Sequence, residues 1–152
     1  MDFLKQKKII KINDLRIGNI VLYGSLFQSH IITGINLNEN SVKICPKNHL
    51  HNDISDSLFN TKELIVPIKV ITSASINLNN LNDYGFIWEK QDLVYFIING
   101  YKFFVYSYKT SEASISYESD KFAVKTTVYS LHELQNIFKT VSGVDFIDIN
   151  KF

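Results

Sequence analysis

Alternating apolar residues mark the second half of the chain most clearly, in residues 92–108 (DLVYFIINGYKFFVYSY). Two strand-like runs are joined there by Asn99-Gly100, a pair that favours the type I′ turn of a two-residue β-hairpin. Every second side chain along each strand then lies on the same face. The cross-strand pairs predicted on one face are Ile98 with Tyr101, Phe96 with Phe103 and Val94 with Val105.

Weaker patterns surround this hairpin. Leu78 and Leu81 lie three positions apart, which favours a short helix, and Gly85 is expected to end it. Further apolar runs predict strands at 114–117, at 122–129 and in the tail 145–152. We therefore expect the second half to contain an antiparallel sheet.

Short apolar runs separated by polar turns make up the first half. The runs expected to form strands are 9–12, 15–24, 30–35, 41–44 and 63–71. Gly18-Asn19 interrupts the second run and predicts a bulge or tight bend, and Pro67 in the last run predicts a sheet edge or a bulge. Strands of this length predict a small, strongly bent barrel of the SH3-like type over 8–71, with an exposed loop at 46–60.

The fold class expected from these elements is α+β. Residues 1–72 are expected to form the small SH3-like β-barrel, and residues 73–152 an antiparallel sheet with one main helix. The boundary falls in 72–77, which is not rich in Gly or Ser. We therefore expect two domains, with the barrel packed on the sheet. The alternative is that both parts form one compact unit.

The main helix is predicted from residues 128–143 (VYSLHELQNIFKTVSG). Ser130 at the N-cap and Glu133 three residues later form a capping box, and Gly143 is a suitable C-terminal stop. The apolar stripe consists of Leu131, Leu134, Phe138 and Val141, with Ile137 beside it. The residues expected on the solvent side, as a contact surface for a partner, are His132, Gln135, Asn136 and Lys139.

The same helix begins like a zinc-protease motif. That motif, His-Glu-x-x-His, needs its second His four positions after the first, so that both lie on one helical face. The chain has Asn136 at that position after His132, and Asn is a poor zinc ligand. His49 and His51 lie in the polar loop without an evident third ligand, and His30 begins a strand as a surface or hydrogen-bonded histidine. No metal site is therefore predicted.

Composition places the chain among ordinary globular domains. Of its 152 residues, 45% are hydrophobic and 20% are charged, which is enough apolar material for a core. The formal net charge is +1 and Arg16 is the only arginine, which argues against sequence-specific reading of DNA. Neither a Gly-rich phosphate loop nor a Gly-x-Ser-x-Gly elbow is present, so we predict no catalytic residue and no cofactor.

Targeting signals and cysteine usage indicate the compartment. Cys45 is the only cysteine and cannot form an internal disulfide, so a reducing compartment is expected, with Cys45 half-buried at a strand end. No apolar run is long enough to span a bilayer, and the N-terminal sequence lacks the features of a signal peptide. We expect a cytoplasmic protein, in a bacterium or infected cell, or a component of a phage particle.

The hairpin strand from Gly100 to Tyr106 compares in part with the aromatic strand of RNA-recognition motifs. It has the glycine and three of the expected aromatic positions but departs at Lys102 and Phe104. Bases can stack on Tyr95, Phe104 and Tyr106 if these side chains are exposed. The interpretation we favour is that both faces of the hairpin are covered, one by the terminal helix and one by the first half of the protein.

Three segments together resemble a known group of proteins. They are Leu15 to Val21 (LRIGNIV), Ile76 to Phe86 (ending in Tyr-Gly-Phe), and Tyr129 to Asn136 (YSLHELQN) with Gly143 after it. Their order is similar to that in a group of small proteins, without an assigned activity, from phages and prophages of Bacteroidetes-type bacteria. The resemblance implies a bacterial or phage source and no catalytic activity.

The function expected from these observations is that of a non-enzymatic binding protein, encoded by a phage or prophage, which acts through a protein partner. A homo-oligomer is compatible with it. One alternative is a phage antagonist of bacterial immunity that binds a defence protein or sequesters a nucleotide signal. The others are a structural component of the virion and, with weaker support, a module that binds single-stranded nucleic acid.

Overall fold

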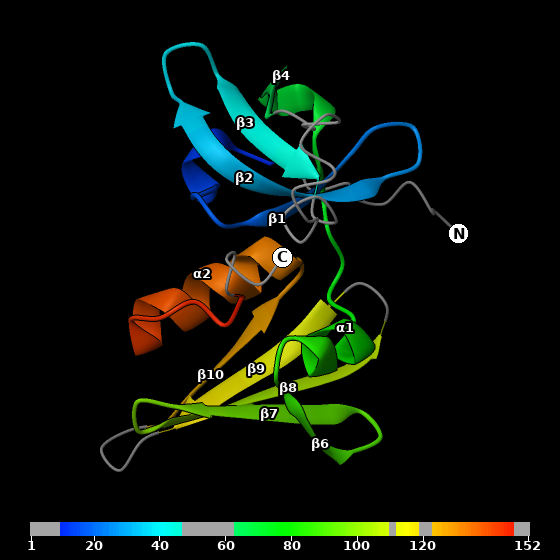
Figure 1. Ribbon diagram of the computed structural model, residues 1–152. Helices are drawn as coiled ribbons and strands as arrows, with labels where there is room; N and C mark the ends of the chain where they lie inside the picture. The colour runs from blue at the N-terminus through cyan, green and yellow to red at the C-terminus, as the bar shows by residue number, and fades with distance from the viewer. Residues whose placement is uncertain (1–9, 47–62, 110–111, 119–122, 148–152) are drawn as a thin grey trace, which may run out of the picture. The chain divides into compact units, whose positions relative to one another are not determined.

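The computed structural model describes residues 10–46, 63–109, 112–118 and 123–147 (Figure 1). These residues divide after Ala74 into two compact units, 10–74 and 75–147. Each unit is built on a five-stranded antiparallel sheet, and the second also contains two α-helices. The expected α+β class is therefore confirmed.

The first unit is a meander of short strands. Its elements are the 3₁₀ helix η1 (Ile12–Asp14), β1 (Ile20–Tyr23), β2 (Gln28–Asn36), β3 (Ser41–Pro46), β4 (Leu64–Pro67), the 3₁₀ helix η4 (Ile68–Val70) and β5 (Thr72–Ser73). The strand order is β4-β3-β2-β1-β5, so the last strand returns to pair with the first. Among the described residues this sheet does not close, because β4 and β5 remain its edges.

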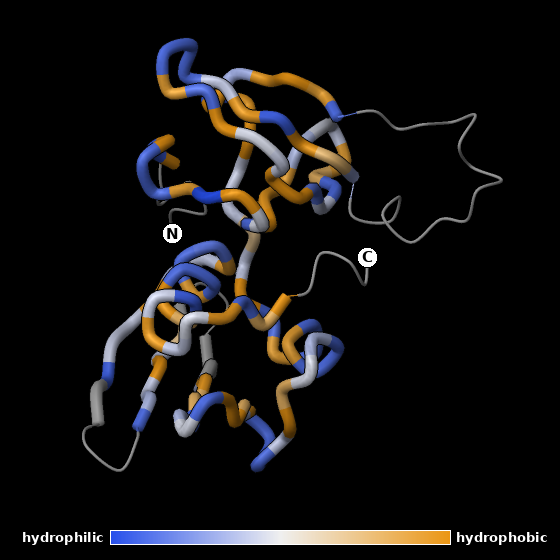
Figure 2. Tube along the Cα trace, turned by 60° about the vertical axis from the view of Figure 1, so that its left-hand side comes forward, coloured by the Kyte–Doolittle hydropathy of each residue, from blue (hydrophilic) through white to orange (hydrophobic). Residues whose placement is uncertain are grey.

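Side chains from nearly every element of the first unit meet in one apolar core. The buried members are Ile10, Leu15, Val21, Ile32, Val42, Ile44, Val66, Ile68 and Ile71. Alternation along the strands supplies them, because every second residue of a strand faces the same side. In Figure 2 the turn between β2 and β3 is mostly hydrophilic, and the strands on either side of it contain apolar stretches.

The expected bend at Gly18-Asn19 is present. Gly18 has a φ of 95°, which favours glycine, and the Asn19 side-chain oxygen accepts a hydrogen bond of 2.8 Å from the Arg16 amide. Pro67 ends the edge strand β4, where its missing amide leaves no gap in the sheet. The strand expected at 9–12 is wrong in its described part, because Ile12 begins a 3₁₀ turn.

The second unit is a meander of five longer strands between two helices. Its elements are α1 (Leu78–Asp83), β6 (Ile87–Lys90), β7 (Leu93–Ile98), β8 (Tyr101–Lys109), β9 (Glu112–Glu118), β10 (Ala123–Val128) and α2 (Leu131–Ser142). The sheet order is β10-β9-β8-β7-β6, and α2 lies along one face of it (Figure 1). The strand expected in the tail is not formed by residues 145–147, and 148–152 lie outside the described residues.

The hairpin predicted from Asn99-Gly100 is confirmed, with its register. Both turn residues have positive φ, 49° and 79°, as the type I′ turn requires. The cross-strand pairs Ile98 with Tyr101, Phe96 with Phe103 and Val94 with Val105 are those expected from the sequence.

A cluster of phenylalanine rings joins α2 to the sheet. Phe138, at the middle of the helix, has its ring centroid 4.4 Å from that of Phe103, 5.0 Å from Phe146 and 5.4 Å from Phe96. Phe86, which follows α1, lies 6.1 Å from Phe138 and so brings the first helix into the same cluster. Aromatic pairs at these separations add to the free energy gained from burial alone.

The Ser130 half of the predicted capping box and the predicted glycine stop are both present at the ends of α2. The Ser130 hydroxyl accepts a hydrogen bond from the Glu133 amide at 3.4 Å, and the Glu133 carboxylate accepts one from the Tyr129 amide at 3.1 Å. The carboxylate therefore reaches one residue before the N-cap, where a capping box would use the N-cap amide itself. Gly143 closes the helix with a φ of 80°.

Replacement of Phe138 by Ala should lower the free energy of unfolding of the second unit by about 3–5 kcal/mol, because it empties the centre of the ring cluster. Trp88, the only tryptophan, lies in this unit, so its fluorescence during urea denaturation follows the loss. Lys139→Ala, at the next, exposed position, is the control and should change stability by less than about 0.5 kcal/mol. Equal losses in the two variants would contradict the role given to Phe138.

Gly85→Ala and Gly143→Ala separate backbone strain from packing. Both positions have positive φ, 103° and 80°, so both variants should be strained by about 1 kcal/mol. Only at Gly85 does an added Cβ meet a neighbour, the Phe96 ring at 3.1 Å, whereas nothing lies within 4 Å at Gly143. Urea denaturation should therefore show the larger loss for Gly85→Ala, by about 1–2 kcal/mol. Equal losses in the two variants would show that the Phe96 ring moves aside without cost, and would contradict the packing effect.

Candidate binding site on the outer face of the second sheet

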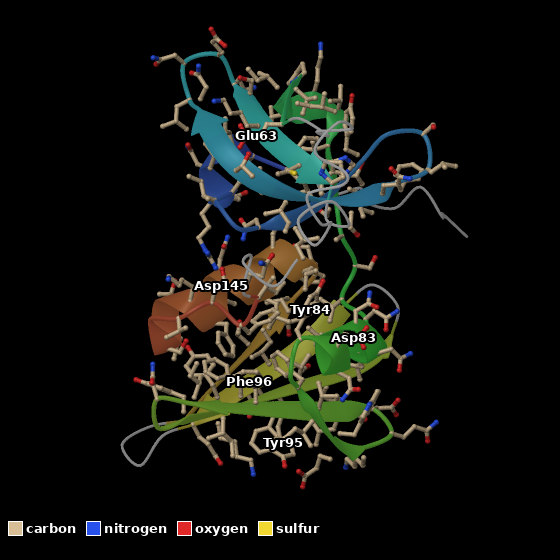
Figure 3. All side chains as sticks on the ribbon, viewed as in Figure 1. Glu63, Asp83, Tyr84, Tyr95, Phe96 and Asp145 are labelled. Carbon is tan, nitrogen blue, oxygen red and sulfur yellow. The ribbon has the colours of Figure 1, made fainter. Side chains whose placement is uncertain are left out.

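The face of the second sheet opposite α2, called the outer face below, carries the side chains that alternate with the buried ones. Tyr95 and Phe96 are adjacent on β7 and point to opposite sides of the sheet (Figure 3). Strand pairing then brings residues from all five strands into rows. One row contains Ile87, Tyr95, Phe104, Ser116 and Lys125, and the next contains Lys90, Leu93, Tyr106, Ser114 and Thr127.

A hollow of about 420 Å³ opens on this outer face. Its lining residues come from β6 to β10 and are Lys90, Leu93, Phe104, Tyr106, Ser114, Ser116 and Lys125. The sequence of β9 explains the depression, because Ala113 and Ile115 turn inward and are buried while the small side chains of Ser114 and Ser116 turn outward. The hollow is thus a product of the alternation in β9 beside two large aromatic residues of β8.

The charge around the hollow is positive. Lys90 on β6 and Lys125 on β10 come from opposite edges of the sheet, and the lining residues within the described part of the chain include no carboxylate. Lys102 lies farther along β8, with its ammonium nitrogen 4.9 Å from the ring centroids of both Tyr95 and Phe104. Glu118, across from Lys102 on β9, is the acidic residue that balances part of this charge.

The three aromatic residues singled out from the sequence are brought together here. Tyr95 and Phe104 face each other across β7 and β8 with ring centroids 6.3 Å apart, and Tyr106 follows Phe104 on the same face. Tyr106 is 36% exposed and Ile97, on the same face, is 65% exposed. The expected cover of this face by the first half of the protein stays a prediction.

Sequence reasoning missed the polar part of the hollow. The outward serines are visible as every second residue of β9, in Ala113-Ser114-Ile115-Ser116. Lys90 and Lys125 gave no such signal. Lys125 reaches the row of Phe104 only through the register of two successive strand pairs, β8 with β9 and β9 with β10. Lys125 is 21 residues from Phe104 in sequence, so their proximity can be recognised only from the fold.

Four residues were expected on the solvent side of α2, and this prediction is wrong for two of them, which are buried. His132 is 2% exposed and Gln135 is 0% exposed, whereas Asn136 is half-buried and Lys139 is exposed. The helical period explains Gln135, which lies four residues after Leu131 and three before Phe138 and so shares their buried face. The proposed contact surface on this helix is thereby reduced to Asn136 and Lys139.

Histidines and carboxylates form no group of three that could hold a metal ion within the ranges that the structure describes. His30 is buried, and its Nδ1 donates a hydrogen bond of 2.8 Å to the Gln28 carbonyl. Its ring packs edge-on against Tyr23, with centroids 5.4 Å apart, so this histidine has a structural role. His49 and His51 lie outside the described residues.

No helix in the described part of the chain has the length and apolar character needed to cross a bilayer. Comparison with known proteins adds no further assignment: no protein-family model, no curated protein and no solved structure matches this chain. The outer face is therefore interpreted from its own geometry and chemistry.

Cys45 on β3 is buried rather than half-buried. Burial raises the pKa of its thiol above the ordinary value for cysteine, and the carboxylate of Glu63 raises it further. The strand register accounts for this second effect, because Ile44 pairs with Leu64 and the next residues outward are Cys45 and Glu63. Since the thiolate is the reactive form, the geometry favours an inert thiol.

The rate at which Cys45 reacts with a thiol-specific disulfide reagent should therefore be low near neutral pH, because the raised pKa keeps the thiol protonated. Rising pH should accelerate it, with a midpoint above that of an unperturbed cysteine. Glu63→Gln should shift that midpoint to lower pH, because it removes the negative charge that opposes ionisation. Glu39→Gln, an exposed acid of the same unit, is the control. An unchanged midpoint in Glu63→Gln would contradict the assignment.

Proposed function

We propose that the chain is a non-enzymatic binding protein and that the outer face of its second sheet is the contact surface. The observation that carries this proposal is the hollow of about 420 Å³, whose described lining consists of two lysines, two aromatic residues, two serines and Leu93. Its volume lies in the range of about 300–1,000 Å³ that is common for ligand sites. The partner it fits is anionic and carries a flat apolar group.

The lining residues support recognition rather than turnover. Lys90 and Lys125 supply positive charge, Ser114 and Ser116 supply hydroxyls, and Phe104 supplies a ring surface. These groups attract charge, form hydrogen bonds and stack, which are the means of selecting a ligand.

A protein partner remains a second candidate, supported by the turn between β1 and β2. Leu26 is 78% exposed and Phe27 is 51% exposed at adjacent positions of this turn. Large apolar side chains that are exposed side by side are typical of protein contact sites.

We also propose that the first unit is SH3-like, because β5 returns to β1 after the 3₁₀ helix η4, in a meander of the order β5-β1-β2-β3-β4.

For the biological setting we propose a phage or prophage source, on the resemblance of the three segments described above. The protein would then act either as an antagonist of bacterial immunity in the infected cell or as part of the virion. Copurification with phage particles at a fixed stoichiometry separates the second setting from the first.

A fused-ring aromatic sulfonate, anilinonaphthalene sulfonate, tests the contact surface without assuming the natural partner. We expect the folded protein to bind it at a saturable site, seen as increased dye fluorescence. Lys125→Glu should weaken binding by about tenfold or more, because it replaces a cation of the hollow by an anion. Lys69→Glu, at an exposed position of the first unit, makes the same change in charge elsewhere and should bind as the wild type does. Equal binding by the two variants would overturn the proposed contact surface.

A further inference from the structure

We propose that the hollow on the outer face binds a phosphorylated nucleoside, either free or as part of a single strand of nucleic acid. The inference rests on the proposed function, since it names the ligand of the same surface. The base would stack on the rings of β8, and the phosphate would lie among the lysine and serine side chains.

The rings of β8 supply the platform for a base. Phe104 and Tyr106 are two residues apart on this strand, so both point to the outer face with an offset of about 7 Å along it. Aromatic side chains on a sheet surface bind bases through stacking that accepts any base, because every base has a π-face. An acidic peptide would need the lysines but would leave this ring surface without a use.

The groups around the rings match a phosphate. Ser114 and Ser116 lie beside them on β9 and can donate hydrogen bonds, and Lys125 pairs with Ser116 across the strands. Phosphate oxygens accept hydrogen bonds only, and lysine binds phosphate as a point charge. Among the described residues that line the hollow, Lys90 and Lys125 are the charged ones, and both are cations.

The small number of cations bears on the length of the ligand. Two lysines line the hollow, and Lys102 over Tyr95 and Phe104 is a third on the same face. A protein that covers a long strand carries a row of such residues, whereas the formal net charge here is +1. The geometry points to one or a few nucleotides. If two phosphates are contacted, the logarithm of the association constant should fall with the logarithm of salt concentration with a slope of about −1.4.

Calorimetric titration of the whole chain tests the proposal. The probes are adenosine 5′-monophosphate, adenosine, ribose 5-phosphate, inorganic phosphate and a ten-nucleotide single strand of deoxythymidine. We expect the nucleotide to bind at least about tenfold more tightly than adenosine or either phosphate alone, because ring and phosphate contacts act together. A strand that binds more tightly than the mononucleotide identifies nucleic acid as the source, and a strand that binds more weakly identifies a free nucleotide.

Variants of the outer face locate the binding. Tyr106→Ala should weaken nucleotide binding by about tenfold while Tyr106→Phe, which keeps the ring, retains it. Lys125→Ala should weaken binding of the nucleotide and reduce the salt slope by about 0.7, and Lys69→Ala, at an exposed position of the first unit, should change neither. Thermal unfolding of each variant, compared with the wild type, shows that the fold is retained.

Three results would overturn the inference. One is failure of all nucleotide probes to bind while the aromatic sulfonate still binds in a Lys125-dependent way, which leaves the proposed function standing. Another is Lys125-dependent binding of polyglutamate in place of the nucleotides, which identifies an acidic protein partner. The third is nucleotide binding that Tyr106→Ala and Lys125→Ala leave unchanged, which places it elsewhere. Failure of both the sulfonate and the nucleotides would overturn the proposed function as well.

Discussion

The packing of Phe138 against the rings of the second sheet is the interaction on which the architecture of this unit depends. It fixes α2 to one face, through Phe103 at 4.4 Å, and draws in Phe146 and Phe86 from the segments after each helix. Because the strands alternate, a helix that occupies one face leaves the other to carry an unrelated set of side chains. The arrangement of the outer face is therefore a consequence of where the phenylalanines of the helix side lie.

Local signals in the sequence were enough to predict the elements that need no distant partner. Asn99-Gly100 specified its turn and thereby the register of β7 and β8, and Ser130 with Glu133 specified the start of α2. The helix at 78–83 was also predicted, and its N-cap Asn77 accepts a hydrogen bond of 2.9 Å from the Asn79 amide. In each case the chemistry that fixes the element lies within a few residues of it.

The remainder depended on contacts that a linear pattern does not contain. The strand β6 was not predicted, because all four of its residues are exposed and no alternation marks them. Gln135 and His132 were placed on the wrong side, because an amphipathic pattern counts apolar residues and overlooks buried polar ones. Lys125 joined the candidate site only through the pairing of β8, β9 and β10. Tyr95, Phe104 and Tyr106 were recognised because they belong to one hairpin.

The hydrogen bond from the Asn99 side chain to the Ser142 carbonyl, 3.0 Å long, connects the tip of the hairpin to the last turn of α2. It links residues that are 43 positions apart in sequence, so the length of β7 has to match the length of α2. Six residues of β7 extend about 20 Å and twelve residues of α2 about 18 Å. In the evolution of this fold an insertion in the hairpin would uncouple the turn from the helix unless α2 lengthened as well. The two segments are therefore expected to change length together among related sequences.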